Sequence, residues 1–312
     1  MFRSRAYRYD NEQVVLTITL LLVLGVIILT ATVTFCMSAV FIIAMFVISA
    51  LMIRAHHKAL MQEAFMVSPI RAPELAHVIE ECQVKLQPGD VQVYLAKKNQ
   101  MNAYTFGIDS PKVLVLYTPL LKVLSPNELK FIIGHEMGHV ALGHTWLNTI
   151  IGGIAGIPAP FGAAILLVAA FRWWNRMCEF SADRAGLLAC GDLNLAVSAM
   201  VKLIAPEVRT QREFNEALAA IDAQDDNVSN RLAEVFQTHP ILIRRINKLR
   251  DYTRSAQYQR MQAGVNANVG DVQPRTYSTA PSASSPEPMA RKEPEMPPKS
   301  PENRWPWLKP RE

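Results

Sequence analysis

Residues 14–53 contain no charged side chain, and this run of forty residues restricts what the chain can become. A straight helix of that length would measure about 60 Å, twice the roughly 30 Å of a bilayer's hydrocarbon core. We therefore expect a transmembrane helical hairpin, with spans over residues 14–30 and 33–53 and a turn near Thr30-Ala31-Thr32. The run is too long for the apolar part of a cleaved signal peptide.

Basic residues flank this run on both sides and predict its orientation. They are Arg3, Arg5 and Arg8 before it, and Arg54, Lys58 and Arg71 after it. Because positive charge marks the cytoplasmic side, both ends of the hairpin and the domain that follows are expected in the cytoplasm. Residues 1–13 would be a short basic lead with interfacial tyrosines. A bacterial inner membrane is the preferred placement of this multi-pass protein, and an organelle membrane is the alternative.

His135, Glu136 and His139 form the pattern H-E-x-x-H, the strongest chemical signal in the chain. Residues four apart on an α-helix lie about 40° apart around its axis, so both imidazoles leave from one face. Two such imidazoles can hold a zinc ion, and Glu136 can reach a metal-bound water as general base. The pattern also arises by chance, so ordinary helix histidines are the alternative.

The flanking residues predict a helix around this pattern. Ser125, Pro126 and Glu128 suit an N-cap, a first helical position and a capping-box glutamate. Gly134 and Gly138 would let a neighbouring strand or the substrate approach the metal face, although each glycine weakens the helix.

A catalytic zinc usually has three protein ligands, so one more is expected. The extended pattern H-E-x-x-H-x-x-G-x-x-H is absent, because Leu142 and Thr145 occupy the positions of its glycine and last histidine. His144 would lie about 140° around a continuous helix from His139 and could not join the same metal. We expect it to be a surface or capping histidine.

The third ligand should therefore come from another helix, and Glu179 is the leading candidate. A helix is predicted over residues 172–189, with Glu179 and Asp183 on one face. Asp183 could then accept the N–H of a ligating imidazole and fix its orientation. In the alternative, the two carboxylates form a solvated acidic face matched by nearby arginines.

Before the helix that carries His135 and His139, the alternation of apolar and polar residues predicts a small β-sheet, with strands over residues 91–95, 102–107 and 112–117. Its edge could receive an extended peptide as an added strand, or the strands could simply pack against the helix. After the metal helix, Asp192 is expected to cap a helix that reaches Ala205. Pro206 would open the next, and the last would start near His239 and Pro240.

Residues 149–171 form a second apolar stretch without charge. A single membrane crossing here would separate Glu179 from the two histidines, so a single crossing is excluded if Glu179 is a ligand. Prolines at 158 and 160 instead predict two short helices that enter the membrane and return, or lie against its surface. Residues 255–312 are rich in proline and serine and are expected to be a disordered tail.

The overall composition gives weaker limits. The net charge is +5, but basic residues form no patch interleaved with aromatics, so nucleic acid is not an expected partner. Four cysteines without a C-x-x-C pair suit a reducing compartment better than a disulfide framework.

Three ordered motifs resemble those of the M48 zinc metallopeptidases. They are His135-Glu-Met-Gly-His139, Glu179-Phe-Ser-Ala-Asp183, and His239-Pro240 followed by Arg245. The segment from Asn102 to Gly107 is also similar to the family's Asn-Ala strand. The resemblance covers roughly residues 60–250, and the apolar hairpin matches the HtpX-like branch, whose apolar insert is longer than the one here.

The resemblance implies a gluzincin fold: an α+β, mainly helical peptidase domain over residues 54–254 with a small sheet. It implies one zinc ion, held by His135, His139 and Glu179. Glu136 would be the general base, and Asp183 would accept a hydrogen bond from one of the ligating imidazoles.

Further roles follow from the same resemblance. His239 and Arg245 would stabilise the oxyanion of the tetrahedral intermediate. Asn102 and Ala103 would lie beside the bound substrate backbone.

These features predict a membrane-bound zinc endopeptidase that cuts membrane-associated or misfolded proteins. The expected partners are protein or peptide substrates, the lipid membrane, and proteins that bind the tail. The alternative is a non-catalytic zinc-binding adaptor acting through its Pro-rich tail, although a structural zinc site has no need of Glu136. A prenyl-protein protease would need more apolar segments than the chain contains.

Overall fold

The computed structural model describes residues 4–33, 37–107, 110–154, 162–208, 210–222 and 242–270. The predictions for Pro158, Pro160, His239 and residues 271–312 fall outside these ranges. Within them the chain is mainly helical with one small sheet, as the sequence predicts.

The elements follow one another in a fixed order along the chain. They are η1 (Ser4–Tyr7), α1 (Glu12–Val33), α2 (Met37–Glu63), β1 (Ala64–Met66), α3 (Pro73–Leu86), β2 (Val91–Ala96), β3 (Ala103–Phe106), β4 (Lys112–Tyr117), α4 (Thr118–Val123), α5 (Pro126–Ala141), α6 (His144–Ile154), α7 (Gly162–Cys190), α8 (Leu193–Ile204), α9 (Gln211–Asp222), α11 (Leu242–Thr253) and α12 (Ala256–Gly270).

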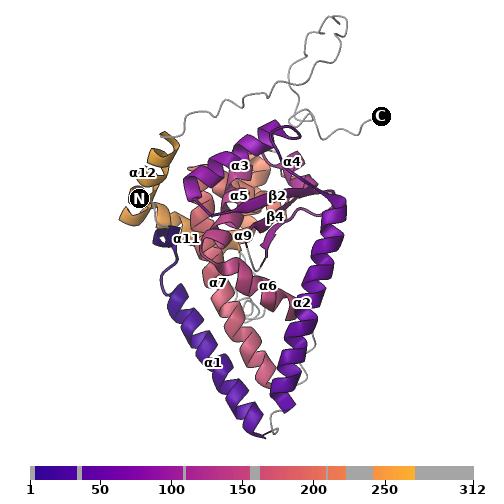
Figure 1. Cartoon of the computed structure of the whole chain (residues 1–312). Coiled ribbons are helices and arrows are strands. Elements are labelled where there is room, and N and C mark those ends of the chain that lie inside the picture. The colour runs from indigo at the N-terminus through magenta and orange to yellow at the C-terminus, as the bar shows by residue number, and fades with distance from the viewer. Residues whose placement is uncertain are drawn as a thin grey trace, which may run out of the picture.

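Helices α1 and α2 extend from the rest of the domain as the two arms of a V, with α7 reaching down between them (Figure 1). Helix α1 packs against α7, and α2 packs against α6. In the described part of the chain, α1 contains the one eighteen-residue window, Glu12–Leu29, that is apolar and uncharged enough to cross a membrane. Helix α2 continues to Glu63, ten residues beyond the predicted span.

The sheet has four strands in the order β1-β2-β4-β3. Strands β2 and β4 are parallel, with Val93 opposite Leu114, whereas β3 runs antiparallel to β4, with Tyr104 opposite Val115. The three predicted strands are therefore confirmed, and the short β1 is an addition. Strand β3 forms one edge of the sheet and contacts α5 and α6, which places that edge beside the helix that carries His135.

The start of α5 is fixed as the sequence predicts. Ser125 accepts a hydrogen bond from the backbone of Glu128, and the Glu128 carboxylate accepts one from the backbone N–H of Ser125. The same carboxylate accepts hydrogen bonds from Ser198 and Lys202 of α8, each at 2.6 Å. The capping box therefore also ties α5 to α8.

Glycines allow α5 and α7 to pack at very short range. A Cβ added to Gly138 would lie 2.6 Å from the Ala185 Cβ, and one added to Gly186 would lie 2.7 Å from the Phe131 carbonyl oxygen. The Cβ of a residue at position 134 would similarly overlap that of Ala189. The expectation that Gly134 and Gly138 admit a strand or substrate was wrong, because a second helix occupies this space.

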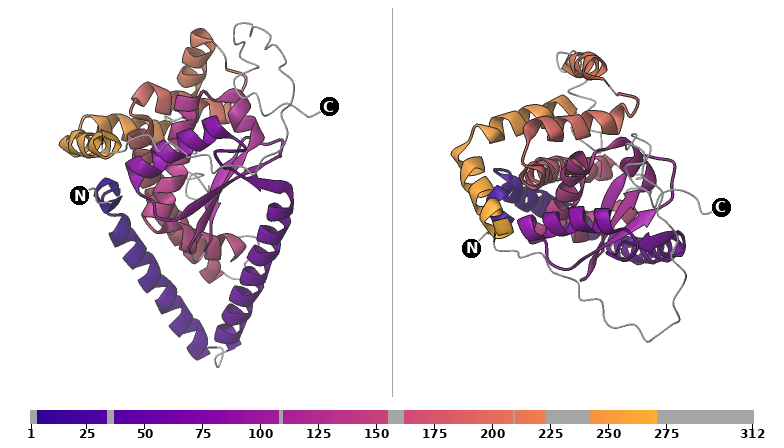
Figure 2. Two further views of the ribbon diagram at one scale, coloured as in Figure 1. Left: turned by 45° about the horizontal axis from the view of Figure 1, so that its top comes forward. Right: turned by 90° about the horizontal axis from the view of Figure 1, so that it is seen from above.

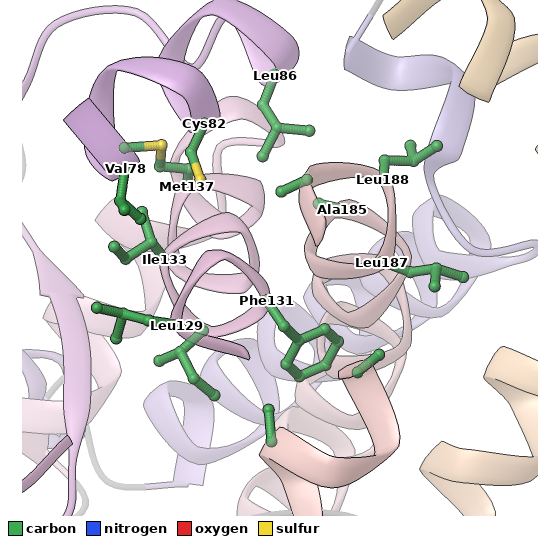
Figure 3. Close-up of a cluster of buried hydrophobic side chains, with 14 of the residues drawn as sticks. Val78, Cys82, Leu86, Leu129, Phe131, Ile133, Met137, Ala185, Leu187 and Leu188 are labelled. Atoms are coloured by element: carbon green, nitrogen blue, oxygen red, sulfur yellow. The ribbon is translucent and has the colours of Figure 1, made fainter. Parts of the chain in front are cut away.

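Apolar side chains of α3, α5 and α7 fill the centre of the domain (Figure 3). The buried set drawn there includes Val78, Cys82, Leu86, Leu129, Phe131, Ile133, Met137, Ala185, Leu187 and Leu188. This core surrounds the two helices that carry the predicted metal ligands, so their relative position is fixed by packing.

Residues 4–12 and 256–270 are folded onto the domain, although the sequence predicts otherwise. Residues 256–270 form α12, whose Met261 and Val265 are buried in the main core, so a disordered tail starting at residue 255 was wrong for this stretch. At the other end, Tyr7 is fully buried, so residues 4–12 are part of the domain and more than a basic lead. Figure 2 shows α12 beside this N-terminal segment.

Two further boundaries differ from the predictions. Pro206 lies in a turn, and the helix predicted there begins only at Gln211. Helix α7 begins at Gly162 and so continues the predicted 172–189 helix into the apolar stretch. Asp192 caps α8 as predicted, with its carboxylate accepting from the backbone N–H groups of Asn194 and Leu195.

Replacing Gly138 with alanine should force α5 and α7 apart. Because the new methyl would overlap Ala185, we expect a loss of about 1–3 kcal/mol of unfolding free energy, measured by denaturant titration in mild detergent. Gly25→Ala is the matched control, since a Cβ at Gly25 in α1 meets nothing within 4 Å. Equal stability of the two variants would contradict the close packing.

Candidate metal centre

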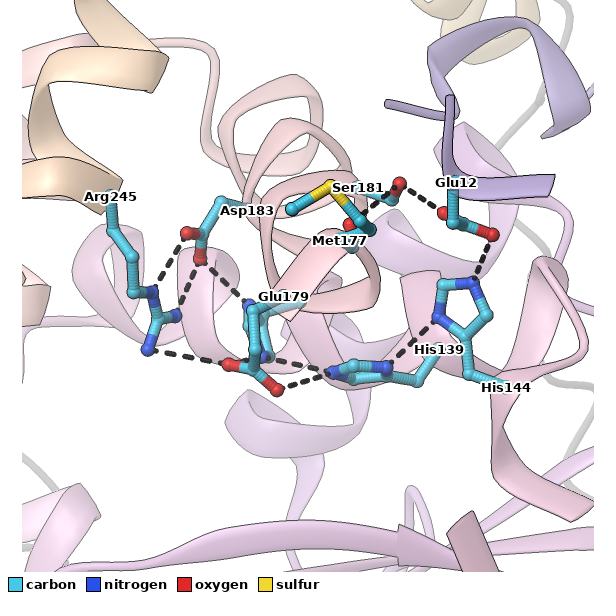
Figure 4. A network of polar contacts seen from close by, with 9 residues as sticks. Glu12, His139, His144, Met177, Glu179, Ser181, Asp183 and Arg245 are labelled. Carbon is cyan, nitrogen blue, oxygen red and sulfur yellow. Dashed lines mark hydrogen bonds and ion pairs between the residues drawn. The ribbon is translucent and has the colours of Figure 1, made fainter. Parts of the chain in front are cut away.

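Three side chains from two helices place their ligand atoms within 4.8 Å of one another. Figure 4 labels two of them, His139 and Glu179. Helix α5 supplies His135 and His139, and the neighbouring α7 supplies Glu179. All three are buried, with 4–9 % of each residue exposed. The predicted ligand set is therefore assembled in the structure.

The distances between these donor atoms match those of a zinc site. The two Nε2 atoms are 3.3 Å apart, and the Glu179 carboxylate oxygens lie 3.4 Å from Nε2 of His139 and 3.7 Å from Nε2 of His135. Tetrahedral zinc with bonds of about 2.0–2.1 Å keeps its ligand atoms about 3.3–3.4 Å apart. The residues present therefore fit zinc without rearrangement of the helices.

The opposite nitrogen of each histidine already has a partner. Nδ1 of His135 lies 3.0 Å from Asp183, and Nδ1 of His139 lies 3.1 Å from Nδ1 of His144. An imidazole that donates from Nδ1 leaves a lone pair on Nε2, which is the form that binds a metal. Both Nε2 lone pairs are then directed at the same point.

Arg245 of α11 anchors Asp183 from the far side. Its guanidinium donates two hydrogen bonds to the carboxylate, at 2.8 and 2.6 Å, and its third nitrogen lies 3.4 Å from Glu179. Burial would raise the pKa of Asp183, but Arg245 outweighs that effect and holds the pKa below its ordinary value. Asp183 is therefore an anionic acceptor for the His135 N–H.

The carboxylates make this centre favourable for a cation. Burial would lower the pKa of His139, but the hydrogen bond to Glu179, together with the charges of Glu179, Glu136 and Asp183, raises it above its ordinary value. A positive charge next to this imidazole is thus stabilised, whether a proton or a metal ion carries it.

Glu136 lies on the same helix between the two histidines and is 9 % exposed. Within the part of the chain that the structure describes, no group donates a hydrogen bond to its carboxylate. A buried carboxylate with free acceptor oxygens beside a metal position is suited to take a proton from water.

His144 occupies a place that the sequence did not predict. Helix α5 ends at Ala141 and His144 begins α6, so the geometry of one continuous helix does not apply. The residue is 1 % exposed and joins His139 to Glu12 of α1, so the prediction of a surface or capping histidine was wrong. Burial lowers the pKa of His144 to about 4, so its ring is neutral at pH 7.

Glu12 is the residue at this centre that sequence reasoning missed. It is a fully buried acid, and the one signal in the sequence was its position just before a long apolar run.

Asn102 is exposed at the start of β3, where its carbonyl accepts a hydrogen bond from the Tyr117 N–H at 3.0 Å. Ala103 is the first residue of that edge strand. His239 lies outside the described residues.

Comparison with known proteins identifies the family. The model of peptidase family M48 matches residues 69–253, which is more than half of the chain. The chain belongs to peptidase family M48. His135, His139 and Glu179 lie within the matched segment, so the candidate metal centre is part of the M48 domain.

Several relatives share this M48 domain. Plastoglobule-localized metallopeptidase 48 of Arabidopsis thaliana is 28% identical over 217 residues, covering 64% of this chain and 63% of the plant protein. Protease HtpX homologs of Burkholderia mallei (strain SAVP1) and Burkholderia pseudomallei (strain 668) are 28% identical over 233 residues, or 64% of this chain and 80% of theirs. The chain thus matches less than two thirds of the plant relative.

Removing Asp183 should weaken both the fold and the metal centre. Asp183→Ala leaves the Arg245 charge without its bidentate partner, for which we expect a loss of about 3–5 kcal/mol in unfolding free energy. Zinc affinity, measured by chelator competition, should fall about 10–100-fold because His135 loses its acceptor.

Two comparisons test this prediction. The double variant Asp183→Ala/Arg245→Met should be less destabilised than Asp183→Ala alone, because no unpaired charge remains. Glu216→Ala removes an exposed partner of Arg212 and should change stability by less than about 0.5 kcal/mol. If Asp183→Ala behaves like Glu216→Ala, the anchoring role is refuted.

Proposed function

We propose that this M48 protein is a membrane-bound, zinc-dependent endopeptidase. The observation that carries the proposal is the convergence of two imidazoles and one carboxylate at zinc-ligand spacing, with the buried carboxylate of Glu136 on the same helix as the two imidazoles. Three protein ligands leave a fourth tetrahedral position for water, the arrangement of catalytic zinc sites.

The chain's own residues divide the work of peptide hydrolysis. A zinc ion held by His135, His139 and Glu179 would lower the pKa of a bound water towards about 7 and polarise the scissile carbonyl. Glu136 takes the proton of the attacking water and passes it to the leaving amine. His239 is the proposed donor to the oxyanion, in keeping with the motifs shared with the family.

For Arg245 we propose a different role from the one that the resemblance implies. All three guanidinium nitrogens face the Asp183 and Glu179 carboxylates, at 2.6 to 3.4 Å. We therefore assign Arg245 to holding the metal ligands in place, instead of direct contact with the oxyanion.

The substrate is proposed to bind in extended form along β3. This strand is an edge of the sheet, and it contacts α5, which carries the metal ligands. Asn102 and Ala103 lie at its start. The Asn102 carbonyl is already bonded to the Tyr117 N–H, so the backbone of Ala103 would pair with the substrate, with Asn102 beside it on the approach to the zinc.

The two N-terminal helices are proposed to form the membrane hairpin. Large apolar side chains are exposed along both arms, including Leu21 and Leu29 on α1, and Val40 and Leu51 on α2. An exposed surface of this kind needs lipid or protein to cover it. Because basic residues lie at both ends of the hairpin, we propose that the peptidase domain faces the cytoplasm.

A non-catalytic zinc-binding adaptor is the second candidate, acting through the Pro-rich residues 271–312. It would keep His135, His139 and Glu179 and bind zinc equally well. Glu136 accepts no hydrogen bond from the residues that the structure describes. Its carboxylate favours the peptidase, because an adaptor gains nothing from a buried base at the metal.

Glu136→Gln separates these two functions. We expect the variant to hold one zinc per chain, as the wild type does, and to lose cleavage of an unfolded casein-like substrate by at least about 100-fold, since the general base is gone. A chelator should abolish wild-type cleavage, and added zinc should restore it. Zinc-loaded wild type that cuts no substrate would favour the adaptor.

The membrane proposal is tested with the whole chain. Wild type expressed in bacteria should stay in the membrane pellet after alkaline carbonate washing. A protease added to sealed spheroplasts should leave a C-terminal tag intact, because both ends face the cytoplasm. Recovery in the soluble fraction, or removal of the tag, would contradict the hairpin.

A further inference from the structure

A chain of three side chains leads from the metal centre to the first membrane helix (Figure 4). Nδ1 of His139 lies 3.1 Å from Nδ1 of His144, and Nε2 of His144 lies 3.0 Å from the Glu12 carboxylate. His144 is 1 % exposed and Glu12 is fully buried. Water therefore does not compete for these contacts.

The position of each proton follows from the geometry. Two imidazole nitrogens 3.1 Å apart can be joined only if one carries a proton and the other a lone pair. If Nε2 of His139 binds zinc, its Nδ1 must be the donor, so Nδ1 of His144 accepts. With Nδ1 of His144 as the acceptor, the proton of that ring lies on Nε2 and is donated to Glu12.

We propose that His144 and Glu12 are positioning residues that fix the tautomer and orientation of His139, and that the first turn of α1 therefore completes the zinc site. The inference rests on the proposed zinc-binding role of His139. With this arrangement, each histidine ligand is linked to a carboxylate through the ring nitrogen that does not bind the metal. His135 reaches Asp183 directly, whereas His139 reaches Glu12 through one intervening imidazole.

Glu12 is held firmly enough to serve this role. Its carboxylate accepts hydrogen bonds from Arg8 and Ser181 as well as from His144. The preceding residues are fastened to the same helices, since Arg8 donates to the Leu142 carbonyl at 2.8 Å and the Tyr9 N–H donates to Ser181 at 2.7 Å. The start of α1 is therefore attached to α7 and to the end of α5.

The guanidinium of Arg184 reinforces this attachment. It lies 4.9 Å from the ring centre of Tyr9 and 4.5 Å from that of Tyr252, and it donates to the Arg8 carbonyl at 2.9 Å. These contacts connect the N-terminal segment to α7 and α11. A shift of α1 along its axis would consequently move Glu12 and, through the contacts of His144, alter the orientation of His139.

A second metal ion is the competing explanation. Ligand atoms of Glu12, His144 and Cys178 lie within 4.8 Å of one another. Against this, the Glu12 oxygens are already occupied by Arg8 and Ser181.

The test compares zinc affinity in variants of the full-length protein in detergent. His144→Phe keeps a ring packed near Trp174 but removes the acceptor, and should raise the zinc dissociation constant about 10–100-fold. His144→Asn, whose amide oxygen replaces Nδ1, should recover most of the loss. Likewise Glu12→Ala should weaken zinc binding, while Glu12→Gln, which keeps an acceptor, should stay within about threefold of wild type.

Thr19→Ala is the matched control. Thr19 is a fully buried polar residue on the same helix, and its hydroxyl donates to the Ala170 carbonyl of α7. This hydrogen bond joins α1 to α7, as Glu12 and Ser181 also do, but Thr19 contacts neither His144 nor His139. We expect its zinc affinity to equal that of wild type, even if its melting temperature falls.

Three results would overturn the proposal. The first is wild-type zinc affinity in His144→Phe, and the second is equal loss in His144→Phe and His144→Asn. The third is two zinc ions in wild type and one in Cys178→Ser, which would make Glu12 and His144 ligands of a second metal. If His144→Phe does not fold, the Glu12→Ala and Glu12→Gln pair gives the same comparison.

Zinc affinity is measured without substrate, so the outcome is independent of proteolysis. Wild type that binds one zinc and cuts nothing removes the proposed endopeptidase but leaves this inference standing. The visible spectrum of the Co²⁺-substituted protein gives a second readout. It should change in His144→Phe and stay unchanged in Thr19→Ala, because only the former alters a ligand's surroundings.

Discussion

The close contact between α5 and α7 is the constraint on which the rest of the structure depends. Glycines at 134, 138 and 186 bring the two backbones to a distance that no side chain would allow. Only at this distance can Glu179 of one helix reach the histidines of the other. The helix weakness that each glycine introduces is offset by burial of the surrounding apolar core, and the capping box at Ser125 secures the first turn.

Charge balance explains how so many ionisable groups remain buried around this contact. Asp183 is neutralised by Arg245, Glu128 by Lys202, and Glu12 by Arg8. Each of these acids also accepts hydrogen bonds from neighbours on other helices, so it works as a connection between elements. Buried carboxylates are costly unless paired, which makes these networks sensitive to loss of a single partner.

The local features of the chain were predictable because they depend on residues close together in sequence. The capping box of α5, the three strands, the cap at Asp192 and the spacing of the H-E-x-x-H pattern all belong to this class. The predictions that failed concern contacts between segments that are far apart in the sequence. Residues 256–270 were expected to belong to the disordered tail, yet Met261 and Val265 insert into a core built by other helices.

The sequence by itself determined the chemistry of this M48 domain, because the ligand types and their spacing on one helix are encoded locally. It also identified Glu179 and Asp183 as candidates, although a solvated acidic face remained possible. Tertiary structure alone decided that Arg245 holds Asp183, that His144 is buried, and that Glu12 lies behind it. These contacts join residues separated by 62 and 132 positions, and only the packing of helices brings such distant groups within hydrogen-bonding distance.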